Sequence, residues 1–463
     1  MSSSLQWLWD RFELFQHSEA VAGQDVRWNY SNLISEIQLG IRTFRNSGIK
    51  SGDVVILESP DHSPEAITAL FSLWALSAIV VPISQAHPMR RETCEGLFPN
   101  AWVCHFGKLS GESERNEISI RHPQVELSSH KYPLLEKLRS ENHPGLVLVT
   151  SGTTGEPKAA LHDVSRFLGK YQVKSRPAMR TLGFLMFDHM GGIDTLAYTL
   201  TGGGCFILLP SLARDPETVA RTVEAFQVEL LAASPTFFNH LLLSDCIEPS
   251  RLSTLKRISY GTETMPGVTL ERLRQKLPWV NLSQSYGTTE LGVPGTRSIA
   301  DDSAWIAIGG SGVDARIENN ELYVRSPYAM IGYLNAPYPF DENGWYATGD
   351  LVETDPSGRF YRILGRKSAL INVGGEKVSP AEVEAVILQA PNIRDVRVTS
   401  QPNPLIGSMI VAHVVLNQPE PLDQLSSRLR LFCQKSLASY QIPIKFQAVP
   451  EIERTSRGKI PRI

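Results

Sequence analysis

Residues 150–160 read T-S-G-T-T-G-E-P-K-A-A and directly follow the apolar run L-V-L-V at residues 146–149. The apolar run predicts a buried strand. Gly152 and Gly155 allow backbone conformations that a Cβ would forbid, so main-chain N–H groups can approach an anion. Hydroxyl donors and a mobile positive charge come from Ser151, Thr153, Thr154 and Lys158. This composition favours a polyphosphate, but the spacing is not that of a Walker A loop, and a polar turn between a strand and a helix is the alternative.

The length and composition indicate a soluble globular protein of more than one domain. A chain of 463 residues exceeds one ordinary core, and hydrophobic residues make up 42% of it. The net charge of -3 gives no electrostatic case for nucleic acid as a partner. The five cysteines are scattered without a C-x-x-C motif, which favours neither zinc nor a disulfide framework and points to a reducing compartment.

Targeting and membrane signals are not expected. The first residues carry neither a basic n-region nor a long apolar core, so they do not resemble a signal peptide. The longest uncharged run, residues 66–89, is interrupted by serines and a proline and predicts a buried helix followed by a strand. We therefore expect a cytoplasmic protein without a membrane span.

Strands and helices alternate through the first part of the chain. Leu33, Ile37, Ile41 and Phe44 repeat at helical spacing, and Ser63 precedes a proline suited to the first position of a helix. Apolar runs predict strands at residues 26–29, 54–57, 79–81, 182–187, 205–209, 230–233, 258–260 and 282–285. This rhythm predicts an α/β fold with a parallel sheet. Several polar motifs directly follow the carboxyl ends of strands, where open sheets of this kind bind ligands.

The pattern changes to short strands from Ala304 onward, with Asn319-Asn320 as a two-residue hairpin turn. We expect a small antiparallel or barrel-like section, then a compact α+β unit whose helix opens with a capping box at residues 379–382. The predicted domains are residues 1–365, a hinge at residues 366–369, and residues 370–463. Residues 104–139 are polar and mixed in charge, and we expect a loop-rich connector there.

Further stretches carry chemistry. Residues 345–350, W-Y-A-T-G-D, would place the Asp350 carboxylate at a turn, where it could accept both hydroxyls of a ribose. Residues 365–384 join the domains and hold an arginine beside a glycine pair. Residues 453–462 carry Lys459 on a glycine-containing loop, preceded by L-A-S-Y-Q-I-P at residues 437–443. The motifs G-T-E and Y-G-T-T-E follow predicted strands at residues 261–263 and 286–290.

With these motifs in this order and spacing, residues 26–463 resemble the adenylate-forming superfamily of acyl- and aryl-CoA synthetases, peptide-synthetase adenylation domains and luciferases. The resemblance implies a large N-terminal domain of parallel α/β sheets with a barrel-like section, and a small mobile α+β C-terminal domain. It also implies ATP, Mg²⁺ and the thiol of coenzyme A or of carrier-protein pantetheine as cofactors.

The resemblance implies roles for individual residues. Residues 151–158 would embrace the β- and γ-phosphates of ATP, and Lys459 would bridge the attacking carboxylate and the α-phosphate. The remaining assignments are adenine for Tyr286, Gly261, Thr262 and Glu263; the α-phosphate for Thr289; Mg²⁺ for Glu290; ribose for Asp350 and Arg366; the mouth of the acyl pocket for His189; and the thiol tunnel for Gly374 and Gly375.

Physical reasoning agrees with these roles but leaves alternatives. A carboxylate that attacks an α-phosphate needs positive charge and fixed N–H donors where negative charge develops. Taken alone, Glu290 could instead be a helix-start carboxylate, Asp350 a turn residue and His189 a structural histidine. Two positions depart from many relatives: Ala159 replaces a glycine, and Ser368 occupies a hinge position that often holds Asp or Lys.

The favoured function is an ATP-dependent carboxylic acid–CoA ligase. The alternatives are a stand-alone adenylation enzyme that loads an acyl carrier protein, a non-catalytic nucleotide-binding scaffold and, on fold analogy alone, a luciferase-like oxygenase. Because Asp188 is one residue out of register with the aspartate of amino-acid-activating relatives, we expect an acid without an amino group. The expected pocket walls are residues 190–196, 234–239, 262–265 and 287–292, with Phe237 and Phe238 as aromatics.

Overall fold

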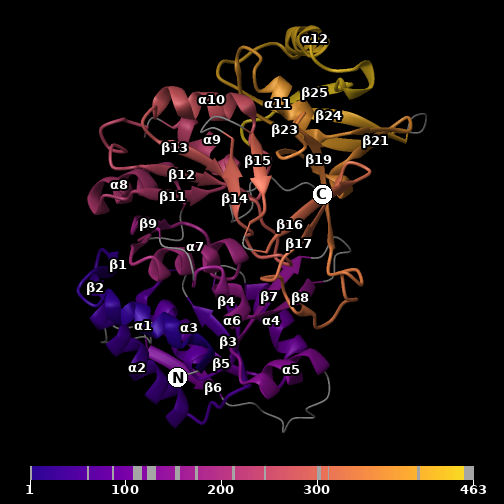
Figure 1. The fold of residues 1–463 in the computed structure, drawn as a ribbon. Coiled ribbons are helices and arrows are strands. Elements are labelled where there is room, and N and C mark those ends of the chain that lie inside the picture. The colour runs from indigo at the N-terminus through magenta and orange to yellow at the C-terminus, as the bar shows by residue number, and fades with distance from the viewer. Residues whose placement is uncertain are drawn as a thin grey trace.

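The computed structural model describes residues 3–59, 62–85, 88–107, 117–121, 132–151, 157–172, 176–210, 214–244, 247–299, 304–310, 312–403 and 407–452. Two seven-stranded sheets, a six-stranded antiparallel sheet and a five-stranded sheet are formed by these residues (Figure 1). The α/β fold with a barrel-like section and a small C-terminal domain is as predicted. No helix in the described part of the chain is long and apolar enough to cross a membrane.

The first sheet has the strand order β18-β8-β7-β4-β3-β5-β6. Its strands are β3 (Val54–Ser59), β4 (Ile79–Ser84), β5 (Trp102–Gly107), β6 (Glu117–Arg121), β7 (Gly145–Ser151), β8 (Pro157–Asp163) and β18 (Gly332–Tyr333). β3, β4, β5 and β7 are parallel, whereas β7 and β8 form an antiparallel pair in which Thr150 faces Lys158. A strand, and not a helix, therefore follows the glycine-rich motif. Its centre, residues 152–156, lies outside the described residues.

The second sheet has the order β13-β12-β11-β9-β10-β1-β2. Its strands are β1 (Glu19–Gly23), β2 (Val26–Asn29), β9 (Arg180–Gly183), β10 (Cys205–Leu208), β11 (Leu230–Ala233), β12 (Arg257–Tyr260) and β13 (Asn281–Gln284). The strands from β9 to β13 are parallel to one another, so their carboxyl ends meet at one edge. The strand predicted at residues 182–187 is shorter, because β9 ends at Gly183.

Helices cover both sheets. They are α1 (Gln6–Leu14), α2 (Tyr30–Asn46), α3 (Pro64–Ala75), α4 (Pro88–Leu97), α5 (Pro133–Glu141), α6 (Val164–Gly169), α7 (Met190–Thr201), α8 (Pro216–Phe226), α9 (Pro235–Leu243) and α10 (Gly267–Lys276). One hydrophobic cluster joins the sheets through α2, α3 and α7, and a second fills the space between the second sheet and α8, α9 and α10. The predicted cap at Ser63 is confirmed, since its hydroxyl accepts from Ala66 N at 3.0 Å. Where a loop-rich connector was expected at residues 104–139, the described residues contribute to β5, form β6 and begin α5.

The six-stranded sheet is the barrel-like section. It contains β14 (Thr296–Ser298), β15 (Trp305–Ile308), β16 (Asp314–Glu318), β17 (Glu321–Arg325), β19 (Tyr346–Thr354) and β20 (Tyr361–Arg366). The predicted hairpin turn between β16 and β17 is confirmed: Asn319 and Asn320 have φ values of 50° and 63°, which asparagine tolerates. This sheet closes one side of the site described below.

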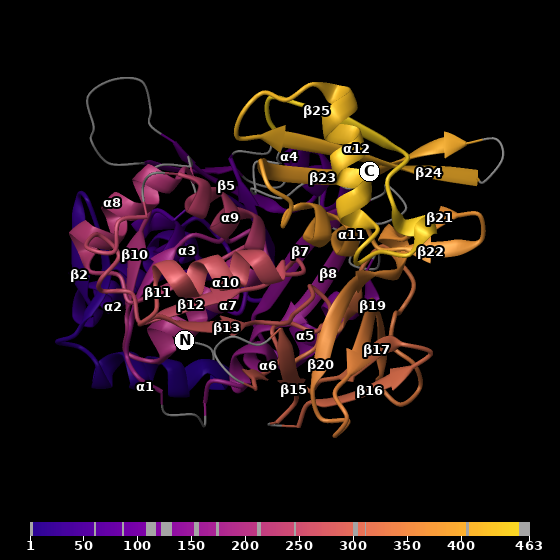
Figure 2. The ribbon, with the colours of Figure 1, turned by 90° about the horizontal axis from the view of Figure 1, so that it is seen from above.

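The C-terminal domain follows a 3₁₀ helix at Lys367–Ala369. It contains β21 (Ile371–Val373), β22 (Glu376–Val378), α11 (Pro380–Ile387), β23 (Ile393–Asn403), β24 (Gly407–Leu416), α12 (Leu422–Cys433) and β25 (Lys445–Ala448), around its own core. Figures 1 and 2 show this gold domain at one end of the molecule, beside α10 and β19. The predicted capping box is wrong: Ser379 makes no side-chain cap, because its hydroxyl donates to Leu364 O at 3.2 Å and so links α11 to β20.

Candidate active site

A cavity of about 1070 Å³ runs along β11 to β13, from the first residues of these strands to the loops beyond their carboxyl ends, between α7 and the barrel-like section. Several predicted site residues line it together: Lys158, His189, Gly261, Thr262, Tyr286, Thr289, Glu290 and Arg366. Glu263, Asp350, Gly374 and Gly375 are not among the lining residues. Gly152, Thr153, Thr154, Gly155 and Lys459 lie outside the described residues, and Ser151 is the last residue of β7.

Tyr286, Asp350 and Arg366 form one hydrogen-bonded unit. The Tyr286 hydroxyl donates to Asp350 Oδ2 at 2.7 Å, and Arg366 Nε lies 2.6 Å from Asp350 Oδ1. Burial raises the pKa of Asp350, although the Arg366 charge opposes the shift. Burial also raises the pKa of Tyr286, and the neighbouring Asp350 charge adds to the effect. Tyr286 and Arg366 line the cavity, whereas Asp350, to which both are bonded, does not.

The expectation of a turn at Asp350 is wrong. Asp350 lies inside β19, directly opposite Arg366 in β20, and only 5% of its surface is exposed. The preceding Gly349 has φ of +73°, and β19 has two extra residues opposite β17, where the pairing moves from Glu321–Leu351 to Tyr323–Ala347. A bulge of this kind re-aims side chains without ending the strand, which explains how a strand residue reaches the edge of the site.

Glu290 is held by Tyr333, a residue that sequence reasoning missed. The Tyr333 hydroxyl donates to Glu290 Oε1, while Glu290 O accepts from Met330 N at 2.8 Å. Lys158 Nζ lies 5.4 Å from the centre of the Tyr333 ring. Burial raises the pKa of Tyr333, and the Glu290 charge adds to the shift. Glu290 occupies a turn enclosed by the Thr288–Gly292 bridge and does not begin a helix, so the helix-start interpretation is wrong.

Asn335 forms hydrogen bonds with the strand that follows the glycine-rich motif, and sequence reasoning missed this residue as well. Its Oδ1 accepts from Ala159 N, and its Nδ2 donates to Pro157 O, both at 2.8 Å. The backbone continues the contact, because Leu334 N donates to Ala159 O at 2.9 Å. The segment around β18 therefore holds both Glu290 and the strand that carries Lys158. Tyr333 in the two-residue strand β18 and Asn335 just after it have no local sequence pattern that predicts this role.

The other end of the cavity holds a buried charge pair. Lys170 Nζ donates to Asp194 Oδ1 and, at 3.0 Å, to Val293 O. The Tyr171 hydroxyl donates to the same Asp194 oxygen at 2.6 Å. Burial lowers the pKa of Lys170, against the opposing influence of Asp194. Sequence reasoning named Asp194 only within a pocket wall, although its spacing of four residues from Met190 places both on one face of α7.

His189 directly precedes α7 and lines the cavity. Its Nε2 lies 3.3 Å from Oδ1 of the buried Asp188, and about 30% of the His189 side chain is exposed. Phe237 and Phe238 do not line the cavity, contrary to expectation. Both are buried in the core behind the second sheet, because the Ser234 cap orients α9 with these rings toward that core.

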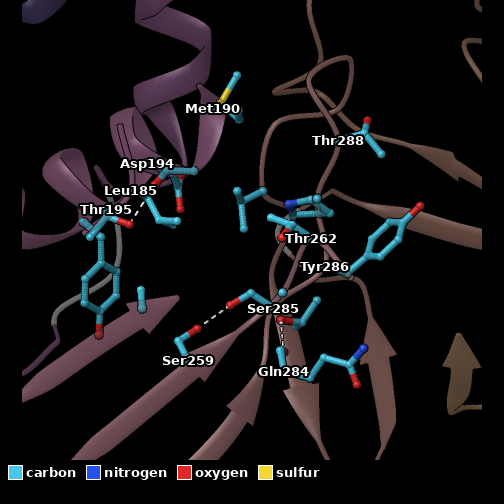
Figure 3. Close-up of a pocket in the computed structure, with 18 of the residues that line it drawn as sticks. Leu185, Met190, Asp194, Thr195, Ser259, Thr262, Gln284, Ser285, Tyr286 and Thr288 are labelled. Atoms are coloured by element: carbon cyan, nitrogen blue, oxygen red, sulfur yellow. Dashed lines mark hydrogen bonds between the residues drawn. The ribbon is translucent and has the colours of Figure 1, made fainter. Parts of the chain in front are cut away.

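Figure 3 shows the part of the cavity that lies between α7 and the strands of the second sheet. Asp194 and Thr195 come from α7, whereas Ser259 and Ser285 approach one another from the strand side, with their hydroxyl oxygens 2.6 Å apart. Tyr286 and Thr288 lie on the far side of these serines from Thr195. The donor set near Glu290, one carboxylate beside threonine hydroxyls, fits Mg²⁺, which is commonly held by one or two carboxylates and substrate phosphates.

Comparisons with known proteins identify similar sequences and structures. The sequence profile of the AMP-binding enzymes matches residues 104–334, and that of the AMP-binding enzyme C-terminal domain matches residues 382–459. A 2-succinylbenzoate–CoA ligase of Bacillus licheniformis is 27% identical, over 98% of both chains. A 4-coumarate–CoA ligase-like protein of Oryza sativa subsp. japonica is 25% identical, over 89% of this chain and 83% of that protein. The crystal structure of the anthranilate CoA ligase AuaEII with anthranoyl-AMP has the same fold, with a TM-score of 0.81 at 20% identity, over 99% of this chain and 95% of that one.

Proposed function

Because the chain belongs to the AMP-binding family of adenylate-forming acid–thiol ligases, we propose that it joins a carboxylic acid to the α-phosphate of ATP and then transfers the acyl group to coenzyme A. The observation that carries the proposal is the single cavity shared by two sets of residues. Lys158, Glu290 and Arg366 lie at one end, and the polar pocket between α7 and the strands of the second sheet lies at the other.

In the first half-reaction a carboxylate oxygen of the acid attacks the α-phosphorus. The new bond forms as the bond to the bridging oxygen of the β-phosphate breaks, and pyrophosphate leaves with that electron pair. The resemblance assigns Lys158 and the adjoining loop amides to the leaving phosphates and Lys459 to the oxygens between acid and α-phosphate. These groups supply positive charge where negative charge accumulates. Mg²⁺ at Glu290 would neutralise phosphate charge in the same way.

In the second half-reaction the thiol attacks the acyl carbon, and AMP leaves with the electron pair of the broken mixed anhydride bond. We assign the required domain rotation to residues 366–369. Gly374 and Gly375, which we assign to the thiol path, form an exposed hairpin turn between β21 and β22 with φ of +61° and +95°. Residues that carry a side chain rarely adopt these backbone angles. Glycine therefore makes the turn possible and also leaves the backbone open to a narrow thiol arm.

For the acid, we propose an aryl or medium-length acyl group without an α-amino group. The named ligases among the relatives include ones for 2-succinylbenzoate and for long-chain fatty acids, and one solved neighbour is an anthranilate CoA ligase. The buried Asp194 does not offer a site for an α-ammonium, because Lys170 and Tyr171 already satisfy it. A non-catalytic scaffold would have no chemical need to keep Lys158, Glu290 and Arg366 around one cavity.

Acid-dependent exchange of labelled pyrophosphate into ATP tests the first step, with a panel of carboxylic acids. Thioester formation is then measured with coenzyme A and, separately, with a pantetheinylated carrier protein. We expect exchange with at least one acid and a coenzyme A thioester. A thioester on the carrier protein alone would favour the carrier-loading alternative, and no exchange with any acid would contradict the adenylation proposal.

A further inference from the structure

The end of the cavity farthest from Glu290 is polar and positively charged. Over the whole described lining, the basic side chains are Lys158, Lys170, Arg176, Arg214, Arg257, Arg297 and Arg366, against the acidic Asp194 and Glu290. Arg176 and Arg257 lie at the far end, because Arg257 is the first residue of β12 and Arg176 contacts Tyr198 near the end of α7. Small polar side chains, among them Thr195, Ser259 and Ser283, line the space between. An alkyl chain placed here would cover these groups without offering hydrogen bonds, which is unfavourable.

The length of this pocket follows from the strands that form its floor. Arg257, Ser259 and Gly261 are successive cavity-lining positions on and just after β12, and Asn281, Ser283 and Ser285 are their counterparts along β13. At a rise of roughly 3.3 Å per residue, the four-residue path from Gly261 to Arg257 spans about 13 Å. If the reacting carboxylate lies at the Gly261 end, an acid about as long as this path reaches Arg257 with its far end.

Tyr198 on α7 organises the charge at that far end. The Arg176 guanidinium lies 4.8 Å from the centre of the Tyr198 ring and donates to Tyr198 O at 2.9 Å. From β12, Arg257 Nη1 lies 3.5 Å from the Tyr198 hydroxyl. No carboxylate in the described part of the chain lies within ion-pair distance of Arg176 or Arg257.

The lining carboxylate Asp194 forms its ion pair with Lys170 and not with Arg176 or Arg257. Asp194 accepts from Lys170 and from Tyr171, so its charge is already matched by a buried ammonium and a hydroxyl. The Arg176 guanidinium instead stacks at 4.5 Å on the Tyr171 ring. The surplus positive charge therefore lies at Arg176 and Arg257, on either side of Tyr198.

We propose that the acid activated here carries a second carboxylate, held at the far end of the cavity by Arg176 and Arg257. This inference rests on the proposed function, because it names the substrate class of the same cavity. A carboxylate at this position would form charge-assisted hydrogen bonds with two guanidinium groups that are already oriented by Tyr198. Selectivity then comes from both a favourable ion pair and the cost of covering the arginines with an uncharged group.

The test compares straight-chain dicarboxylic acids, from adipate to dodecanedioate, with their monomethyl esters, which keep length and lose the distal charge. Pyrophosphate exchange gives kcat/KM for each acid, and the shift in Tm gives binding without catalysis. We expect one diacid to exceed its ester by about tenfold or more in kcat/KM. This ratio falls toward one in Arg257→Met and in Arg176→Met. The matched control, Arg42→Met on the exposed face of α2, keeps the wild-type ratio.

Equal use of diacid and ester by the wild type, or an equal loss for both acids in Arg257→Met, overturns the inference. Arg257 is exposed at the start of β12, so this variant keeps the test decisive if Arg176→Met fails to fold. A diacid that raises Tm in the wild type but not in Arg257→Met, without exchange, supports the distal site and contradicts the adenylation proposal. Neither exchange nor a Tm shift with any diacid overturns both.

Discussion

Asp350 and Arg366 stand directly opposite each other in β19 and β20, and their side chains form an ion pair of 2.6 Å. Tyr286 donates to the other oxygen of the same carboxylate, so the last residue of β20 is anchored to the loop that carries Glu290. Lys367 is held as well, since its Nζ lies 3.0 Å from Glu321 Oε2. A pivot between the domains therefore belongs after these anchored residues, which favours Ser368.

Ser368→Pro is expected to block the rotation. Ser368 is exposed in the 3₁₀ helix Lys367–Ala369, and proline would fix its φ near −65° and remove its N–H. Thioester formation should fall by about 10²-fold, while adenylation changes little because the ATP site lies in the large domain. Single-turnover assays of each step check this, with circular dichroism for folding. Ser368→Ala is the control, and wild-type rates in both steps would move the pivot elsewhere.

Lys459→Ala is expected to impair adenylation alone. Lys459 lies outside the described residues, and the family resemblance places its charge between the attacking carboxylate and the α-phosphate. Removing such a group should slow adenylation by about 10²–10³-fold. Thioester formation from supplied acyl-adenylate should persist. Lys445→Ala, on the exposed side of β25 in the same domain, is the matched control. An equal loss in both half-reactions would indicate a structural role for Lys459.

Glu290→Gln is expected to raise the Mg²⁺ concentration that gives half-maximal adenylation by about tenfold, because a neutral amide replaces an anionic ligand. Binding of Mn²⁺, followed by electron paramagnetic resonance in the presence of ATP, gives a second measurement. Tyr333→Phe should produce a smaller shift, since it frees the carboxylate without removing it. Glu318→Gln on the exposed end of β16 is the control. An unchanged Mg²⁺ curve would remove Glu290 from the metal site.

The stability of the fold is expected to decrease in mild acid because of two buried histidines. Burial lowers the pKa of His62 and of His162 to about 3 in each case. The unfolded chain binds these protons near pH 6.5, but the folded chain does not until about pH 3, so unfolding becomes easier as the pH falls through this window. Each histidine contributes a slope of about 1.4 kcal/mol per pH unit in the free energy of unfolding.

Denaturant unfolding at a series of pH values checks this slope. His62→Gln keeps a donor for Leu185 O, which lies 2.7 Å from His62 Nε2. This variant should reduce the slope by the contribution of one histidine. His17→Gln, at an exposed position, is the matched control. An unaltered slope in His62→Gln would mean that His62 is protonated in the folded chain.

Local patterns were enough to predict the α/β class, most strand positions and the motifs around the cavity. Each depends on neighbours in the chain: the apolar runs that became β3, β4 and β7, the Ser63 cap, and the paired asparagines between β16 and β17. The same reasoning failed where a distant group competes. Ser379 was expected to cap its own helix, but its hydroxyl donates to Leu364 O in β20.

Only the tertiary structure decided which side chains meet. Tyr286 reaches Asp350 across 64 residues, Tyr333 reaches Glu290 across 43, and Lys170 reaches Asp194 across 24. Such pairs depend on the order of strands in the sheets and on the bulge of β19 opposite β17, which no short-range propensity specifies. The motifs therefore indicated the chemistry, whereas the packing of sheets and helices determined the geometry and charge of the cavity that serves it.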